Sequence, residues 1–189
     1  MIKQAVILVG GRGERLNDKV RFTPAIETPK PLVEVGGRPF IYYAIRYLTG
    51  IGFKDIVLLV GHKKEMFDFL CTGIVRAVTT QDNVDKAVLD IPHLDDMFVL
   101  LNGDCLPIMD FNILKNRTTP CTTIKIIGRD AGCAVVAKKD IESGLVSCGN
   151  ILDMENVYES VMIWGGLHIG TVAGLDRARQ FASIVMYGA

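Results

Sequence analysis

The chain has neither a long hydrophobic run nor an excess of charge of one sign. No apolar segment approaches the roughly 20 residues that a membrane-spanning helix needs. Lysine and arginine together number 21, as do aspartate and glutamate, so the formal net charge is zero. This balance offers no electrostatic footprint for a nucleic-acid polymer or an anionic membrane, whereas a small charged ligand needs only a locally basic site. The N-terminus carries no apolar leader with a cleavage signal, so we expect a cytoplasmic protein.

Cysteine is scarce and unpaired in its spacing. There are five cysteines, an odd number, and no Cys-x-x-Cys pair, which argues against a disulfide framework and against a thiolate zinc site. Intrinsic disorder is excluded because hydrophobic residues make up 49% of the chain and the mean hydropathy is +0.30. With 189 residues and no repeat or linker, residues 1–189 are expected to form a single domain. The sequence leaves the oligomeric state open, with a homo-oligomer among the alternatives.

Strand-like and helix-like segments alternate along the first half of the chain. Apolar runs predict parallel strands, buried on both faces, over 5–9, 55–60, 74–79 and 97–101. Helix-like patterns lie between them at 40–48 and 63–71, and a terminal helix is expected over 175–185. After residue 104, short segments predict added antiparallel strands over 122–127, 133–137, 145–147 and 151–154. The pattern predicts an α/β fold with a doubly wound, mostly parallel mixed sheet.

A glycine-rich loop follows the first strand. It reads Val9-Gly10-Gly11-Arg12-Gly13-Glu14-Arg15-Leu16, and glycines there let backbone N–H groups approach an anion. Leu16 stands where the dinucleotide fingerprint needs glycine, which disfavours an NAD-binding oxidoreductase, and no Gly-Lys-Ser/Thr forms a P-loop. The alternative is a tight turn with no ligand. Further on, Lys30 stands between two prolines that restrict its direction.

These residues resemble the signature of the sugar-1-phosphate nucleotidylyltransferases. The matching blocks are Gly10-Gly11-x-Gly13-x-Arg15-Leu16, Pro29-Lys30-Pro31-Leu32 and Val35-Gly36-Gly37-Arg38-Pro39-Phe40-Ile41, and the similarity returns at 100–104. The resemblance implies a Rossmann-like fold and an enzyme that makes an NDP-sugar and pyrophosphate from an NTP and a sugar 1-phosphate. The implied nucleotide-binding set is Val9, Gly10, Gly11, Gly13, Gln81 and Gly103. By the same resemblance, Arg15 stabilises the leaving pyrophosphate and Lys30 stabilises the phosphorus centre under attack.

Such a transfer needs no protein nucleophile, because the acceptor phosphate itself attacks the α-phosphorus. The protein must instead bring two polyanions together and neutralise charge on the equatorial and leaving oxygens. Asp104 ends a buried strand in Asn102-Gly103-Asp104, where open α/β sheets bind their ligands. A carboxylate at that place suits Mg²⁺ bound together with substrate phosphates. The alternative for Asp104 is a helix N-cap or a turn residue.

The second half departs from the family pattern at its expected second carboxylate. Relatives carry an aspartate before a late Gly-Thr, but this chain has His168 there, in the block Trp164-Gly165-Gly166-Leu167-His168-Ile169-Gly170-Thr171. An imidazole is a poorer partner for hard Mg²⁺. His168 is therefore a second metal ligand or a hydrogen-bonded core residue, with Asp153 and Glu155 as alternative acids. Glu155 also matches one half of a Glu-Lys pair for the acceptor phosphate, and Lys138 or Lys139 is the candidate for the missing lysine.

The expected base pocket departs as well. Gln81 stands where relatives read the nucleobase, but Val84-Asp85-Lys86-Ala87 replaces the small Gly-Thr-Ala-like turn that follows it. Lys86 is either a phosphate or ribose contact or a solvated helix residue. The sequence thus predicts an Mg²⁺-dependent nucleotidyltransferase that acts on an NTP and a small phosphorylated acceptor, without fixing the base or the acceptor. Cytidylyl transfer to a non-sugar phosphate or phosphonate is one alternative, and a nucleotide-sensing relative without activity is another.

Overall fold

The computed structural model describes residues 1–11, 28–79, 83–108, 115–116, 122–126, 129–149, 159–163, 165–169 and 171–187. Within these ranges, only the backbone is described at 107–108, 122–126, 129–131, 159–163, 165–166, 168, 172 and 181–187. No helix in these parts of the chain is long and apolar enough to cross a membrane.

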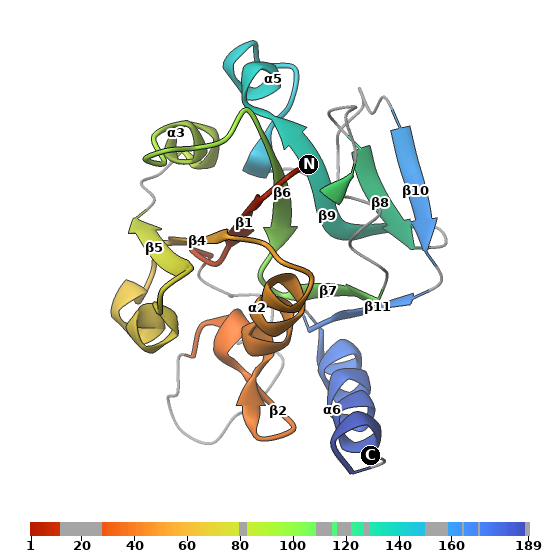
Figure 1. Cartoon of the computed structure of the whole chain (residues 1–189). Helices are drawn as coiled ribbons and strands as arrows, with labels where there is room; N and C mark the ends of the chain where they lie inside the picture. The colour runs from red at the N-terminus through yellow and green to blue at the C-terminus, as the bar shows by residue number, and fades with distance from the viewer. Residues whose placement is uncertain are drawn as a thin grey trace.

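A mixed seven-stranded sheet forms the centre of the molecule, in the order β10-β8-β9-β6-β1-β4-β5 (Figure 1). Its parallel part consists of β1 (Gln4–Leu8), β4 (Asp55–Val60), β5 (Val75–Thr79) and β6 (Met97–Asn102). These strands confirm the four predicted from apolar runs. The second half adds β8 (Thr122–Ile126), β9 (Arg129–Ala137) and β10 (Glu159–Ile163). The β9 strand is antiparallel to β6 and to β8, as expected, whereas β10 pairs parallel with β8.

Alternate residues of the central strands pack into two separate cores, because successive side chains point to opposite faces of a sheet. On one face, Ile7 and Leu58 belong to a cluster covered by α2 (Phe40–Gly50) and the 3₁₀ helix η2 (Lys64–Leu70). On the other face, Val6 and Leu59 belong to a cluster covered by α3 (Val84–Leu89) and α5 (Lys138–Glu142). The sheet is therefore covered on both sides, which explains why the runs 5–8, 56–60 and 98–101 of its central parallel strands are apolar. The edge strand β5 differs from the expectation of burial on both faces, because it carries Arg76 and leaves Ala77 and Thr79 exposed.

Two predicted elements differ in the structure. The segment expected as a helix over 63–71 is the 3₁₀ helix η2, which begins after Lys63 in a left-handed conformation with φ 56°. No strand forms over 145–147. There the chain leaves α5 through Gly144, with φ +73°, and the Val146 amide donates to the Asp140 carbonyl at 3.0 Å. Val146 is apolar because it packs into the core beside α3. The segment 151–154 lies outside the described residues.

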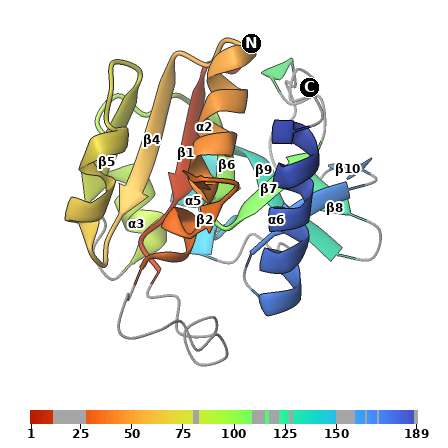
Figure 2. The same cartoon turned by 90° about the horizontal axis from the view of Figure 1, so that it is seen from below.

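Two small two-stranded sheets complete the structure beside the main one. The hairpin of β2 (Glu34–Val35) and β3 (Arg38–Pro39) follows the 3₁₀ turn η1 (Lys30–Leu32) and leads into α2. The strand β7 (Cys105–Ile108) leaves β6 through a turn and pairs antiparallel with β11 (Gly165–His168). The terminal helix α6 (Val172–Tyr187), which was predicted, packs against this part through Leu175 and Ala178, next to Phe40 of α2 (Figure 2).

Candidate functional site

The carboxyl ends of β1, β4 and β6 meet at one edge of the sheet. The Gly103 amide, after β6, donates to the carbonyl of Leu8 at 2.9 Å. The His62 amide, after β4, donates to the carbonyl of Gly10 at 3.3 Å. These two bonds hold the start of the glycine-rich loop, Gly10-Gly11, between the ends of the neighbouring strands. Ligands of open α/β sheets bind at this kind of edge.

Gly103 is the point at which three segments make contact. A Cβ atom added to Gly103 would lie 2.8 Å from the carbonyl oxygen of Leu8, 2.8 Å from Cγ1 of Val9 and 2.9 Å from Cγ of Pro31. Distances this short leave no room for a side chain, so the position requires glycine. Because Pro31 comes directly after Lys30, the close packing brings the lysine-bearing turn to the end of β6. The structure thus brings together three sequence blocks that are far apart along the chain.

Lys30 is held by the turn η1. The Leu32 amide donates to the Pro29 carbonyl at 2.8 Å, and the Val33 amide donates to the Lys30 carbonyl at 3.1 Å. Pro31 is buried, while Lys30 is half-buried. The backbone that carries the ammonium group is therefore fixed against the core. A lysine mounted in this way offers a compact positive charge to a phosphate group at the sheet edge.

Asp104 lies in the turn between β6 and β7 and is half-buried. It begins no helix, so the N-cap alternative is wrong. Its backbone belongs to a turn between two strands. The Cys105 thiol donates to its carboxylate, with 3.4 Å between Sγ and Oδ1. Carboxylate oxygens are ligands that suit Mg²⁺, and the Asp104 carboxylate fits such an ion at the edge where the three blocks meet.

The pairing of β7 with β11 brings His168 to the same place. His168 is the register partner of Cys105, and the Ile169 amide donates to the carbonyl of Asp104 at 3.0 Å. The backbone of His168 therefore lies next to that of Asp104 and Cys105, and its role as a second metal ligand stays a prediction. In chemistry it does not fit Mg²⁺, because an imidazole nitrogen suits transition metals better than this hard ion. Among the described side chains, no group of three or more histidine, cysteine or acidic residues could hold a metal ion.

Other predicted site residues are not brought to this edge. The Lys138 amide donates to the carbonyl of Asp96 at 2.9 Å, next to Met97, the first residue of β6, so Lys138 lies at the opposite end of that strand from Asp104. Its ammonium group forms a long ion pair with Glu142 at 3.9 Å. Lys139 follows it in the same short helix. The remaining predicted residues, Gly13, Arg15, Gln81, Asp153 and Glu155, lie outside the described part of the chain.

The segment that replaces the small base-pocket turn is the start of α3. Asn83 caps this helix, and its Oδ1 accepts from the Lys86 amide at 2.9 Å. Oδ1 of Asp85 accepts from the amide of Cys148, which follows α5 in the chain. Burial, with the nearby Asp85 carboxylate, raises the pKa of the Cys148 thiol. Asp85 therefore joins α3 to the segment after α5, a structural role that the sequence did not reveal.

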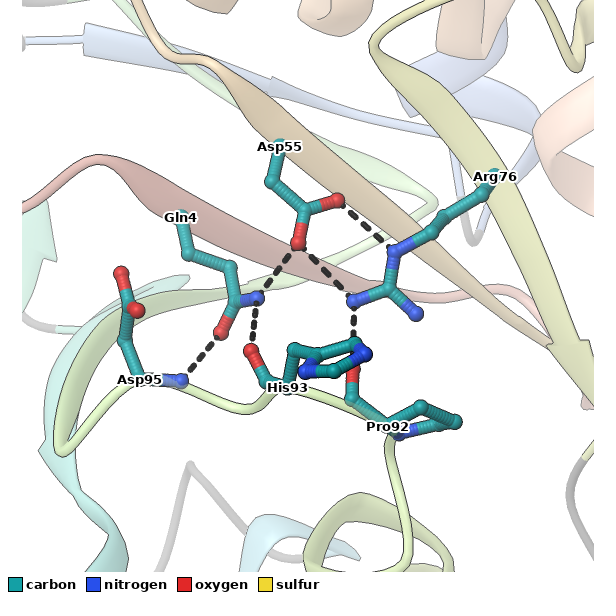
Figure 3. Close-up of polar contacts among 6 residues, drawn as sticks. All are labelled: Gln4, Asp55, Arg76, Pro92, His93 and Asp95. Atoms are coloured by element: carbon teal, nitrogen blue, oxygen red, sulfur yellow. Dashed lines mark hydrogen bonds and ion pairs between the residues drawn. The ribbon is translucent and has the colours of Figure 1, made fainter.

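A polar cluster connects the amino ends of the parallel strands, far from this site (Figure 3). The Nε2 group of Gln4, a residue only 2% exposed, donates to Oδ2 of Asp55 at 2.6 Å and to the His93 carbonyl at 3.1 Å. Its Oε1 accepts from the Asp95 amide at 2.8 Å. The cluster thus fixes the loop that leads into β6.

Arg76 completes the polar cluster from the edge strand β5. Its Nε and Nη2 donate to the two carboxylate oxygens of Asp55, both at 2.9 Å, and Nη2 also donates to the Pro92 carbonyl at 2.9 Å. Burial raises the pKa of Asp55, but the hydrogen bonds from Arg76 and Gln4 outweigh it and hold this pKa below its ordinary value. The cluster joins β1, β4 and β5, and neither its position nor its contacts place it in the candidate site.

Comparison with known proteins gives a family match over the first half of the chain. Residues 5–98 match the MobA-like NTP transferase domain. The chain is 32% identical over 111 residues to a CMP-5'-(3-aminopropyl)phosphonate synthase of Streptomyces rubellomurinus, an alignment that covers 53% of this chain and 17% of the relative. It is 27% identical over 123 residues to a D-glycero-alpha-D-manno-heptose 1-phosphate guanylyltransferase of Aneurinibacillus thermoaerophilus, with 60% and 51% covered. The chain thus spans about half the length of the second relative and less of the first.

Solved structures support the fold across almost the whole chain. HddC from Yersinia pseudotuberculosis, crystallised in complex with GMP-PN, superposes with a TM-score of 0.74 at 18% identity. The superposition covers 95% of this chain and 99% of that one. The predicted fold, a Rossmann-like and mostly parallel mixed sheet with added antiparallel strands, is thereby confirmed.

Proposed function

Because the chain belongs to the MobA-like NTP transferase family, we propose that it transfers a nucleoside monophosphate from an NTP to a sugar 1-phosphate, giving an NDP-sugar and pyrophosphate. The contact that carries this proposal is the close packing at Gly103, which joins the glycine-rich loop, the Lys30 turn and the end of β6. The heptose 1-phosphate guanylyltransferase similarity supports a sugar phosphate as the acceptor. We further propose that residues 1–189 form one nucleotidyltransferase domain, since one continuous sheet uses strands from β1 to β10.

In the proposed reaction, an oxygen of the acceptor phosphate attacks the α-phosphorus of the NTP. A new phosphorus–oxygen bond forms, the bond to the β-phosphate breaks, and pyrophosphate leaves with the electron pair. The Gly10-Gly11 backbone binds the phosphates, and Lys30 places its positive charge beside the phosphorus centre. Arg15 binds the leaving pyrophosphate with its planar fork of donors. No residue of the chain needs to act as a nucleophile, so catalysis rests on positioning and on charge neutralisation.

The proposed cofactor is a divalent cation at Asp104, with Mg²⁺ as the first candidate. Bound there, it would neutralise phosphate charge that otherwise keeps the two substrates apart. Asp104 supplies the ligand, while the turn between β6 and β7 fixes the position of its carboxylate at the edge. His168 is the second candidate ligand, and Gln81 is the proposed reader of the base.

A second acceptor class is supported by one specific observation. The Streptomyces rubellomurinus relative is named as a synthase of a CMP-linked phosphonate. Cytidylyl transfer to a non-sugar phosphate or phosphonate is therefore the alternative activity. Both activities release pyrophosphate, so a panel of NTPs and acceptors distinguishes them through the acceptor alone. A nucleotide sensor would bind an NTP and release no pyrophosphate with any member of the panel.

The decisive experiment measures pyrophosphate release by the full chain and by two variants. Lys30→Ala should lower turnover by about 10²-fold or more, as for the loss of one transition-state donor. Asp104→Asn should abolish the metal-dependent rate while the melting temperature changes little, since the residue is half-buried and caps no helix. Lys54→Ala is the matched control, because Lys54 is an exposed lysine at the amino end of β4. Wild-type rates in both Lys30→Ala and Asp104→Asn would overturn the proposal.

A further inference from the structure

We propose that Cys105 is a positioning residue for the transfer reaction: its thiol, packed against Gly132 of β9, holds the carboxylate of Asp104 in one orientation. This inference rests on the proposed function, in which Asp104 receives a divalent cation. It adds to that function a residue that touches neither substrate nor cation and acts through the aspartate beside it.

The first step concerns the backbone of the turn that carries Asp104. This turn lies between β6 and β7, and the Asp104 carbonyl accepts from the Ile169 amide at 3.0 Å. The preceding residue, Gly103, is packed against the carbonyl oxygen of Leu8 and the side chain of Pro31. The backbone at Asp104 is therefore fixed. A fixed backbone still leaves an aspartate side chain several rotamers, so the orientation of the carboxylate depends on its hydrogen-bond partners.

The second step concerns the hydrogen bond between the two neighbouring side chains. The Cys105 thiol donates to Oδ1 of Asp104, with 3.4 Å between the sulfur and the oxygen. Successive side chains of a strand point to opposite faces, but Asp104 belongs to a turn, which lets its carboxylate lie beside the thiol of the next residue. Cys105 is only 8% exposed, so little water competes for this hydrogen bond. A bond to an ionised acceptor is also stronger than a bond between neutral groups.

The third step concerns Gly132, which limits the space around the thiol. Cys133, the next residue, is the register partner of Leu101 near the end of β6, so Gly132 lies beside the start of the turn. Gly132 has a left-handed backbone with φ 67°. A Cβ atom there would lie 2.6 Å from Sγ and 3.0 Å from Cβ of Cys105. Glycine is thus required both for the conformation and for the space that the cysteine occupies, and the thiol has no room to move toward β9.

These contacts distinguish a positioning role from simple packing. A buried cysteine that only fills space would change the stability of the fold when it is replaced, and it would leave the affinity for a cation unchanged. Removing a group that orients a metal ligand typically lowers metal affinity or activity by about 10- to 100-fold. Because a thiol is a weak donor, we expect a loss near the lower end of that range.

The first test measures cation binding to the full chain without turnover. Mn²⁺ is the probe, since carboxylates bind it as they bind Mg²⁺, and the loss of its free-ion electron paramagnetic resonance signal gives the dissociation constant. Cys105→Ala should weaken Mn²⁺ binding by about tenfold. Cys105→Ser restores a donor at the same position and should recover most of the affinity. The Mg²⁺ concentration that gives half-maximal pyrophosphate release should rise in Cys105→Ala and return toward the wild-type value in Cys105→Ser.

Cys133→Ala is the matched control for the loss of a buried thiol. Cys133 is fully buried, belongs to the core on the α2 side of the sheet, and stands next to Gly132 in β9. Replacing it should lower the melting temperature through lost packing, while the Mn²⁺ dissociation constant should equal that of the wild type. Melting curves establish that each variant is folded at the temperature of the titration.

The second test detects the hydrogen bond itself by infrared spectroscopy. The S–H stretching band lies in a range clear of other protein groups, and a stronger acceptor moves it to lower frequency. The band of Cys105 is assigned by its loss in Cys105→Ser. In Asp104→Asn a neutral amide replaces the carboxylate, so this band should move to higher frequency while the band of Cys133 stays in place. The measurement needs neither cation nor substrate, and it decides the matter even if Cys105→Ala does not fold.

Wild-type Mn²⁺ affinity in folded Cys105→Ala would overturn the proposal, as would equal losses in Cys105→Ala and Cys133→Ala. A Cys105 band that does not move in Asp104→Asn, or a wild-type chain that binds no Mn²⁺, would overturn it as well. The transfer reaction is judged separately by pyrophosphate release. If no substrate pair releases pyrophosphate and Mn²⁺ affinity still depends on the Cys105 donor, the positioning role stands and the transfer reaction is wrong. If pyrophosphate is released and Cys105→Ala equals the wild type, the transfer reaction stands and the positioning role is wrong.

Discussion

Replacing Gln4 by glutamate should make the stability of this protein strongly dependent on pH. The change keeps the size of a side chain that is almost fully buried and replaces its Nε2 donor by an oxygen. That position lies 2.6 Å from Oδ2 of Asp55 and 3.1 Å from the His93 carbonyl. Two carboxylates this close cannot both be ionised, so one must keep its proton. Because Arg76 binds both oxygens of Asp55, the proton should reside on the introduced glutamate.

The cost follows from the pH at which that proton must be retained. Keeping a glutamate with an ordinary pKa of about 4.3 neutral at pH 7 costs at most about 3.7 kcal/mol, since one pKa unit is worth about 1.36 kcal/mol. At pH 5 the same argument gives about 1 kcal/mol. A carboxyl group whose pKa is raised by folding destabilises the protein above its unfolded-state pKa, and the penalty disappears as the pH falls below that value. The variant should therefore approach the wild type in acid.

The assay is the free energy of unfolding by urea between pH 5 and pH 8. Gln4→Met is the matched control, because it has a similar length, removes the side-chain hydrogen bonds of position 4 and carries no charge. Its loss of stability should be nearly independent of pH. The difference between Gln4→Glu and Gln4→Met should grow by roughly 2 to 3 kcal/mol from pH 5 to pH 7. A difference that stays constant over this range would refute the reasoning, because it would mean that the introduced carboxylate ionises freely.

Three further substitutions test other contacts of the fold. Gly103→Ala should cost about 1 to 3 kcal/mol of unfolding free energy and weaken NTP binding, because its Cβ would overlap the carbonyl oxygen of Leu8. Gly50→Ala is the control and should cost nothing, because a Cβ atom there meets open space. Arg76→Ala should lower stability by about 1 kcal/mol at neutral pH. Folding lowers the pKa of Asp55, the carboxylate partner of Arg76. The contribution is therefore fully present above the unfolded-state pKa of Asp55 and is lost as the pH falls through its folded-state pKa. The difference in unfolding free energy between Arg76→Ala and the wild type should shrink in acid. Asp85→Ala should cost about 1 to 3 kcal/mol by leaving a buried amide unpaired, and it should speed alkylation of the Cys148 thiol in the native protein.

The parallel half of the fold could be predicted because its central strands, β1, β4 and β6, are buried on both faces. The run 56–60 of β4, for example, is apolar over its whole length, since alternate residues enter the two separate cores. The segment at 145–147 has a similar composition but forms no strand, because Val146 packs beneath α3 as part of a loop. An apolar run indicates that a segment is buried. It does not distinguish a buried loop from a buried short strand.

The candidate site could be predicted only in part, for a related reason. The chemistry of Lys30 and Asp104 can be inferred from the motifs in which they stand. The approach of the two motifs depends on Pro31 packing against Gly103, a tertiary contact that no local pattern contains. The place of His168 depends on the pairing of two four-residue strands, β7 and β11, that lie far apart in the sequence. Short strands with glycine carry almost no signal of their own, so their pairing had to come from the structure.

The amino ends and the carboxyl ends of the parallel strands are joined by different contacts. We therefore expect that a substitution at the amino ends can change the stability of the protein without changing the site at the carboxyl ends. At the amino ends, Gln4 and Asp55 join the strands through polar groups. At the carboxyl ends, Gly103 is packed against the carbonyl oxygen of Leu8 and the apolar side chains of Val9 and Pro31. A change in the polar cluster should therefore lower the free energy of unfolding while the folded fraction keeps its rate of pyrophosphate release. Gln4→Glu tests this directly: at pH 5, where it should remain folded, its rate of pyrophosphate release should equal that of the wild type at the same pH. A clearly lower rate would show that the two ends are coupled through β1.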